Sequence, residues 1–366
     1  MSRNIRNDSN INSIKTNIGS TTSPEVMSET FNRFFTEIGT NLADQLPNSN
    51  KNYSDFLTPV NSSFQLRQVS LSEVLKLLKN LATNKATGLD KIPCRLVKLA
   101  APVIAESLCY IFNSSIQSGI FPSDWKIAKI IPIHKGNEKD ELNNYRPISI
   151  LSSISKVLER LIYDQLYEYL SNNELLSKCQ SGFRRFHSTT TSLLDAINEW
   201  YSNMDQGKLN SVAFDTVNHS ILLKKLSHYG LHSETMKWFN SYLSERKQQC
   251  WVNGNLSSTK TIKCGVPQGS ILGPLLFLIY INDLPNCLKH SNPRMFADDT
   301  NITAISKSIT KYCDIVWDTI GVTLATRLQK LNNRTGRTIS QLGYEVRSSD
   351  IRSQLGWTTL EETFKS

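Results

Sequence analysis

The sequence predicts an α+β protein, with helices concentrated in its first half and hairpins later. Apolar residues at helical spacing mark the helices, and an Asn-Gly pair between two extended segments marks a hairpin. The chain has 366 residues, of which 39% are hydrophobic, 9% aromatic and 20% charged. This composition can fill a sizeable core and excludes wholesale disorder, a collagen-like chain and a low-complexity chain. The length predicts two or three domains.

The elements are expected in a definite order along the chain. Residues 1–24 are rich in Ser, Asn and Thr and residues 48–63 are polar, which predicts two linkers. Apolar periodicity and one β-branched run predict helices over 25–46, from 70 onward, and over 96–115, 155–170, 192–204 and 234–245, with a strand over 127–133. Ser70 and Glu73 fit a capping box, and the third helix is expected to be buried. Asn253–Gly254 predicts the hairpin turn.

Positive charge exceeds negative charge by nine, with 41 Lys and Arg against 32 Asp and Glu. This surplus favours a nucleic-acid partner, although many globular proteins carry such a charge and bind none. The seven cysteines show neither a C-x-x-C pair nor zinc spacing, which favours a reducing compartment. The N-terminus lacks an apolar run, and the most apolar stretch, 275–281, is too short to span a bilayer. We therefore expect an intracellular protein of the cytoplasm or nucleus that is not secreted and binds no membrane.

Two adjacent carboxylates, Asp298 and Asp299, follow the apolar pair Phe296–Ala297. The pattern predicts a strand that ends in a tight turn. Neighbouring side chains of a continuous strand point to opposite faces and could not share one ion, whereas at a turn at least one carboxylate can reach a hard cation such as Mg²⁺. An isolated Asp-Asp pair is most often a solvated turn, so the function of this pair depends on its context.

Seven motifs in a fixed order supply that context. They are KATGLDKIP at 85–93, IPIHK at 131–135, YRPIS at 145–149, QSGFR at 180–184, AFD at 213–215, PQGS at 267–270 and FADD at 296–299. Through them the chain resembles the reverse transcriptase of non-LTR retrotransposons, closest to the jockey-like type, over residues 70–306. The resemblance implies a right-hand polymerase in which fingers precede a palm.

The resemblance also implies a role for each matched position. Lys135 and Arg146 would grip the incoming triphosphate, with a solvated strand-end Lys and a turn Arg as the alternative. Phe214 would exclude a ribose 2′-hydroxyl, or would be a plain core residue. Gln268 and Gly269 would lie against the nascent base pair. The template-binding residues would be Gln180, Gly182, Phe183 and Arg184.

The metal site that the resemblance implies is the pair Asp298 and Asp299, which would bind Mg²⁺, with Mn²⁺ as an alternative, for two-metal nucleotidyl transfer. The partners would be an RNA template, a DNA primer and deoxynucleoside triphosphates. The first palm motif of the family reads apolar-x-Asp-x-x-x-Ala-Phe-Asp, and its first aspartate is the essential ligand. Counting back from Ala213 places Leu209 at that position, so we interpret the segment that carries the aspartate as deleted and expect an incomplete palm. Asp215 could fill the vacancy if the strand slips in register.

A second departure follows the Asp-Asp pair, after which the resemblance implies that a large internal portion is absent. We therefore expect a thumb that is largely missing and a helical C-terminal tail. We expect a linker or partly helical N-terminal region over 1–69, fingers over 70–204, a truncated palm over 205–309 and the helical tail over 310–366. The sequence thus predicts an RNA-directed DNA polymerase by lineage that is impaired. The alternatives are a catalytically inactive remnant that binds RNA or DNA, and an artefact of gene prediction. The oligomeric state is not predicted.

Overall fold

The computed structural model describes residues 10–17, 19–44, 53–185, 187, 217–288, 291–297 and 299–304. The chain divides into two compact units, Met1–Thr303 and Ala304–Ser366, and the description that follows concerns the first. The predicted helix over 192–204 and the predicted tail over 310–366 lie outside the described residues.

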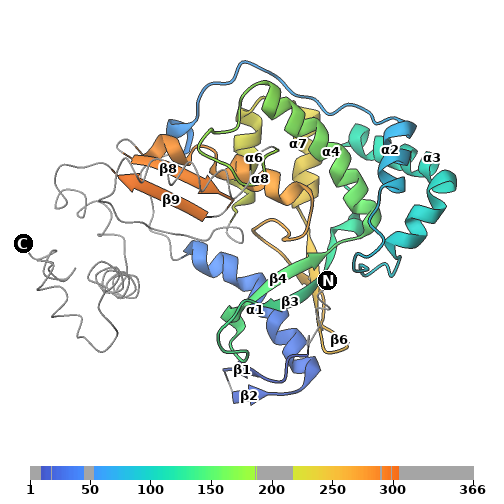
Figure 1. The fold of residues 1–366 in the computed structure, drawn as a ribbon, viewed down its shortest axis with the longest axis vertical. Coiled ribbons are helices and arrows are strands. Elements are labelled where there is room, and N and C mark those ends of the chain that lie inside the picture. The colour runs from blue at the N-terminus through green and yellow to red at the C-terminus, as the bar shows by residue number, and fades with distance from the viewer. Residues whose placement is uncertain are drawn as a thin grey trace, which may run out of the picture. The chain divides into compact units, whose positions relative to one another are not determined.

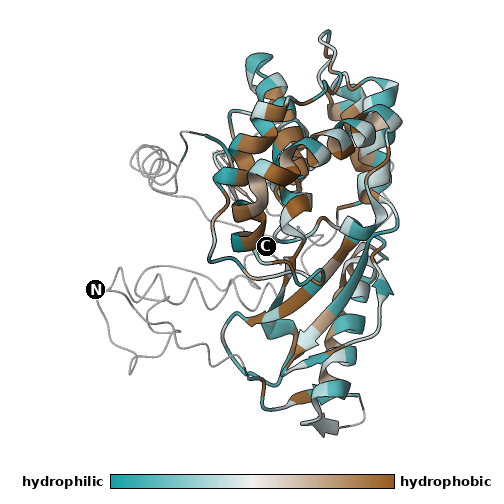
Figure 2. Ribbon diagram, turned by 90° about the vertical axis from the view of Figure 1, so that its right-hand side faces the viewer, coloured by the Kyte–Doolittle hydropathy of each residue, from teal (hydrophilic) through white to brown (hydrophobic). Residues whose placement is uncertain are grey.

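Six of the helices that the structure describes pack around one apolar core. They are α2 (Leu71–Lys79), α3 (Cys94–Ser118), α4 (Ser153–Asn172), α6 (His219–His228), α7 (Ser233–Leu243) and α8 (Leu272–Ile281). Figure 1 shows them grouped on one side of the sheet, and Figure 2 shows apolar residues concentrated where the helices meet. Short 3₁₀ turns cover Tyr53–Phe56, Ser123–Lys126, Leu142–Asn144 and Leu284–Cys287. The core is filled by large side chains such as Leu158, Leu166, Trp238, Phe239 and Leu276, all completely buried.

The predicted helices are confirmed wherever the structure describes them. In α2 the Ser70 hydroxyl accepts from the Glu73 N–H, and the Glu73 carboxylate accepts in return from the Ser70 N–H, as the capping box requires. Arg67 adds an ion pair of 2.6 Å with Glu73. One helix, α6, was not predicted. It is attached to the end of α8 by a buried ion pair, in which Lys225 Nζ lies 2.5 Å from Asp283 Oδ1.

The expectation that the third helix is buried is wrong for one of its faces. Helix α3 packs against α2, α4 and α7 on one side, but Val103 is 81% exposed and Tyr110 is 76% exposed on the other. Apolar composition indicated burial, whereas burial also requires a partner on every apolar face. Within the described part of the chain, α3 is the helix whose length and composition would also permit a membrane crossing.

A five-stranded sheet lies beside the helices. Its strands are β3 (Ile127–His134), β4 (Tyr145–Ile150), β5 (Lys247–Val252), β6 (Asn255–Leu256) and β7 (Lys260–Thr261). The order is β4-β3-β5-β6, with β7 paired to β5, so β4 forms one edge. β3 runs antiparallel to β4 and parallel to β5. The predicted β5–β6 hairpin is confirmed, since Asn253 and Gly254 both have positive φ, as a type I′ turn requires.

The N-terminal segment covers one face of this sheet. Helix α1 (Pro24–Asp44) packs against β5, and its Phe31 meets Tyr145 edge-on with ring centroids 5.0 Å apart. The predicted linker over 1–24 is wrong for residues 14–21, which form the hairpin β1 (Ile14–Thr16) and β2 (Gly19–Thr21). Ile14 is completely buried in the core beneath the sheet. The polar composition of this segment hid the few apolar residues that anchor it.

The last described elements are β8 (Ser291–Phe296) and β9 (Asp299–Ala304), which form a separate two-stranded sheet. β8 ends at Phe296, and Ala297 follows in a left-handed conformation with φ of 56°. The predicted strand that ends in a tight turn is therefore confirmed.

Candidate functional site

One face of the β3–β4 hairpin combines exposed apolar and basic side chains. The antiparallel register aligns Ile133 with Arg146 and Ile131 with Ile148. The Lys135 N–H donates to the Asn144 carbonyl at 2.7 Å and so continues the ladder by one residue. Because alternate residues share a face, five side chains near the turn of the hairpin lie on the same side. This outer face consists of Ile131, Ile133, Lys135, Arg146 and Ile148.

The outer face is the side of the hairpin that α1 leaves uncovered. Tyr145, on the other side, is buried against α1, whereas Ile133 is 48% exposed and Ile148 is 36% exposed. Lys135 and Arg146 are exposed as well. The structure thus brings the two predicted triphosphate-binding cations to the same face, beside an exposed apolar strip.

The residues 267–270, called here the PQGS loop, lie against the free edge of β4. The Ser149 N–H donates to the Gln268 carbonyl at 2.7 Å. Gly269 has a φ of +125°, and a Cβ built on it would lie 2.3 Å from the Ser149 carbonyl oxygen. A glycine is required here by both its conformation and its surroundings. The structure therefore places Gln268 and Gly269 beside the strand that carries Arg146.

A buried carboxylate of α4 holds the start of α8, directly after the PQGS loop. The Glu159 carboxylate accepts from the N–H of Ile271 at 2.7 Å and of Leu272 at 3.3 Å. A negative group is favourable at a helix N-terminus. Burial raises the pKa of Glu159, and the Arg246 guanidinium and the two N–H groups oppose that rise. Sequence reasoning missed Glu159, for which the one available signal is an acidic residue that directly follows the apolar pair Val157–Leu158 of α4.

Arg246 is a second buried charge that sequence reasoning missed. It is 1% exposed, its Nη1 donates to the Tyr242 carbonyl at 2.9 Å, and its guanidinium lies 4.7 Å from the centre of the Tyr242 ring. Its Nε and Nη2 have no hydrogen-bond partner in the part of the chain that the structure describes.

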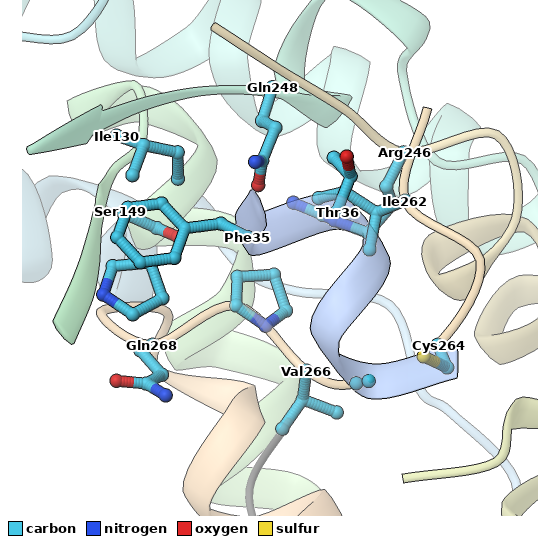
Figure 3. A pocket seen from close by; sticks show the side chains of 14 residues that line it. Phe35, Thr36, Ile130, Ser149, Arg246, Gln248, Ile262, Cys264, Val266 and Gln268 are labelled. Atoms are coloured by element: carbon cyan, nitrogen blue, oxygen red, sulfur yellow. The ribbon is translucent and has the colours of Figure 1, made fainter. Parts of the chain in front are cut away.

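Arg246 lines a small cavity that separates α1 from the PQGS loop. Figure 3 shows Phe35 of α1, Ser149 of β4 and Gln268 of the loop around it. The cavity volume is about 40 Å³. It has room for a water molecule and is far too small for a nucleotide. A nucleotide that contacts this part of the sheet would therefore lie on the outer face.

The predicted template-binding residues lie in two kinds of surroundings, one buried and one partly exposed. Gln180 is 2% exposed, and it and Gly182 lie against the turn between β8 and β9. Phe183 is 43% exposed, with a φ of 54°. The Arg184 Nη1 donates to the carbonyls of Ser177 at 2.9 Å and Gln180 at 3.2 Å and so braces its own loop. Of the four, Phe183 offers the most surface to a ligand.

The predicted metal site is described only in part. Asp215, Phe214 and Asp298 lie outside the described residues, and Asp299 begins β9. Among the residues that are described, no group of three His, Cys, Asp or Glu side chains could hold a metal ion. Carboxylate oxygens suit a hard cation, so the chemistry of Asp298 and Asp299 fits one such ion. A two-metal site needs a further carboxylate from another element.

The chain belongs to the reverse transcriptase family (RNA-dependent DNA polymerase), whose family model matches residues 133–345. The chain is 34% identical over 268 residues to the RNA-directed DNA polymerase from the mobile element jockey of Drosophila melanogaster. The alignment covers 69% of this chain and 29% of that protein. It is also 34% identical over 270 residues to the probable RNA-directed DNA polymerase from transposon BS of the same species. That alignment covers 66% of this chain and 28% of the transposon BS protein. The resemblance predicted from the seven motifs is thus confirmed. The chain spans less than a third of the length of these relatives.

Family membership relates the described elements to one polymerase fold. A reverse transcriptase has a polymerase fold of fingers and palm, and the mixed α+β architecture of this chain agrees with it. The outer face of the β3–β4 hairpin carries two of the matched motifs, and the PQGS loop at its edge carries a third. The fold therefore joins motifs that lie more than 100 residues apart in the sequence.

Proposed function

We propose that the chain binds a deoxynucleoside triphosphate together with an RNA template and a DNA primer, and that its nucleotidyl transfer is impaired. The outer face of the β3–β4 hairpin is the observation that carries this proposal. Lys135 and Arg146 are cations that suit a triphosphate, and Arg can bind phosphate through two donors. Ile133 and Ile148 add an exposed apolar strip that suits a sugar or a base.

The PQGS loop supports the same proposal from the edge of the hairpin. Gly269 brings the loop backbone into close contact with β4, which leaves no room for a side chain between them. A backbone held in this way can lie close to a nascent base pair without obstruction. Phe183 and Arg184 would contact the template, with Phe183 the exposed aromatic on which a base could stack.

The proposed impairment rests on the composition of the first palm motif. Leu209 occupies the position of the essential aspartate, and leucine cannot bind a cation. Asp298 and Asp299 would hold Mg²⁺, or Mn²⁺, which when bound would neutralise negative charge on the phosphates. With one carboxylate fewer, the site would hold its metals poorly. Asp215 remains the alternative ligand, and Phe214 would select against a ribose substrate.

The same motif favours a second candidate function. Without the aspartate, the chain could be an inactive remnant that binds RNA or DNA and transfers no nucleotide. Under either proposal the palm over 205–309 is incomplete, the thumb is largely missing, and the chain acts inside the cell. Nucleotide incorporation separates the two candidates, because only the impaired enzyme would show residual incorporation.

Binding of a deoxynucleoside triphosphate, measured in the presence of a primer annealed to an RNA template, tests the role of the outer face. We expect Lys135→Ala/Arg146→Ala to raise the dissociation constant of the triphosphate by about tenfold or more, since two charge-assisted contacts to its phosphates are lost. The matched control is Lys79→Ala/Arg95→Ala, which removes the same two charges from exposed positions on α2 and α3. Equal losses in the two variants would show that net charge, and not the outer face, drives binding.

A further inference from the structure

We propose that Gln180 and Gly182 are positioning residues that fix the backbone of the turn leading into Asp298. This role differs from contact with the template, which the resemblance implies for both. The link between the turn and metal binding rests on the proposed function. The link between these residues and the turn rests on described contacts alone.

Backbone pairing first brings the two segments together. The Ser181 N–H donates to the Met295 carbonyl at 2.8 Å, and the Met295 N–H donates to the Cys179 carbonyl at 2.8 Å. These two bonds form a parallel bridge between Gln180 and Met295, which are both buried. Strand β8 is thereby held on its path two residues before the turn.

The Gln180 side chain then holds the turn itself. Its Oε1 accepts from the Ala297 N–H at 2.9 Å, and its Nε2 donates to the Ala297 carbonyl at 3.2 Å. The same Oε1 accepts from the Gly182 N–H at 2.7 Å. Both polar groups of one turn residue are therefore satisfied by one side chain, and Ala297 is the residue directly before Asp298.

The conformation of Ala297 explains why such support matters. Its φ of 56° lies in the left-handed region, which an alanine adopts only at an energetic cost. Residues held in such conformations persist when the surrounding structure determines them, and they concentrate at functional sites. The two bonds from Gln180 supply that determination here.

Gly182 is required by the closeness of the two segments. A Cβ built on Gly182 would lie 1.9 Å from the Ala297 nitrogen and 2.7 Å from its Cα. These are backbone atoms that cannot rotate away as a flexible side chain could. Any other residue at position 182 would displace the turn, which makes Gly182 and Gln180 parts of the same support.

Amide hydrogen exchange tests the positioning role with a matched control inside the same chain. Gln165 of α4 makes the same pair of bonds to Arg67, since its Oε1 accepts from the Arg67 N–H at 2.9 Å and its Nε2 donates to the Arg67 carbonyl at 3.2 Å. We expect Gln180→Met to accelerate exchange of the Ala297 amide at least tenfold and to leave the Arg67 amide unchanged. Gln165→Met should do the reverse.

Gly182→Ala provides a second route to the same result, because it displaces the turn and keeps the glutamine. This variant too should accelerate exchange of the Ala297 amide. The amides of the sheet, such as that of Ile148, should keep their protection, and that protection would show that the variant is folded. An Ala297 amide as protected in Gln180→Met as in the wild type would overturn the inference. The inference would also fail if Gln165→Met accelerated exchange of the Ala297 amide as much as Gln180→Met does.

Titration with Mn²⁺ alone, followed by its electron paramagnetic resonance signal, connects the turn to the metal site. We expect Gln180→Met to raise the dissociation constant for Mn²⁺ at least tenfold and Gln165→Met to leave it unchanged. If Asp298→Asn binds Mn²⁺ as tightly as the wild type does, the ion is not held at this pair and the proposed metal site fails. The hydrogen-exchange experiment then still decides the positioning role. Mn²⁺ affinity that is equal in wild type and Gln180→Met would contradict the link between them.

Discussion

Replacement of Gly269 by alanine perturbs the contact between the PQGS loop and β4. The new Cβ would lie 2.3 Å from the Ser149 carbonyl oxygen, and ordinary contact begins at 3.4 Å. The loop must move away by the difference, which breaks the 2.7 Å bond from the Ser149 N–H to the Gln268 carbonyl. Loss of that bond and the unpaired groups it leaves cost about 1–3 kcal/mol. The φ of +125° adds a strain of about 1–3 kcal/mol for alanine.

Gly136 supplies the control that separates these two costs. Its φ is +128°, close to that of Gly269, but a Cβ built on it meets nothing within 4 Å. Gly136→Ala therefore carries the strain without the collision. In urea unfolding followed by circular dichroism, we expect Gly269→Ala to lose about 1–3 kcal/mol more than Gly136→Ala. Equal losses in the two variants would refute the reasoning, because they would show that the loop does not rest against β4 as described.

Four further predictions concern stability and its dependence on pH. Ser70→Ala removes the N-cap of α2 and should lower the free energy of unfolding by about 1 kcal/mol in urea. The neighbouring arginine and Ser70 hold the pKa of Glu73 at about 2, so its contribution is present above pH ~4.3 and is lost as pH falls toward 2. An acid titration in which Glu73→Gln shows the same slope as the wild type would contradict this. Burial raises the pKa of Glu159, so the folded state favours its protonated form and the wild type should lose stability as pH rises above ~4.3. Glu159→Gln should flatten that dependence, and an unchanged profile would count against it. Lys225→Met leaves the Asp283 carboxylate buried without its ion-pair partner and should lower the free energy of unfolding by about 3–5 kcal/mol. The double variant Lys225→Met/Asp283→Asn should lose less. Equal losses in the two variants would show that the two residues are not energetically coupled.

Local patterns in the sequence were sufficient for most helices and for two turns. The capping box at Ser70 and Glu73 and the Asn253–Gly254 turn are encoded by neighbouring residues, so their geometry follows from short-range chemistry. The same holds for the turn at Ala297, where an apolar run ends in two carboxylates.

Features that depend on distant partners were not predictable in this way. Ile14 is buried because it packs beneath the sheet in one core cluster, and nothing in its polar segment indicates that sheet. Val103 of α3 is exposed because none of the described elements covers its face. A sequence pattern reports the character of a face but not the presence of a partner.

The candidate site shows the same division. The motifs indicated which residues would belong to it, and the structure brings two of them, Lys135 and Arg146, to one face of the hairpin. The support of Ala297 by Gln180 was not predictable, because it joins residues that are 117 positions apart. The buried carboxyl group of Glu159 escaped notice for a similar reason, since its partners lie at the start of another helix.

We propose that this member of the reverse transcriptase family keeps the outer face and the PQGS loop as binding surfaces, and that the loss of the first palm aspartate impairs its nucleotidyl transfer. The most direct measurement is single-turnover extension of a DNA primer on an RNA template with Mg²⁺, comparing the wild type with Leu209→Asp, which restores the family spacing Asp-x-x-x-Ala-Phe-Asp. We predict equal binding of the primer and template by the two chains. Incorporation by Leu209→Asp should be faster by on the order of a hundredfold, or about 2.7 kcal/mol of barrier, and should be lost again with Asp298→Asn. A wild-type chain that extends the primer as fast as Leu209→Asp would contradict the account.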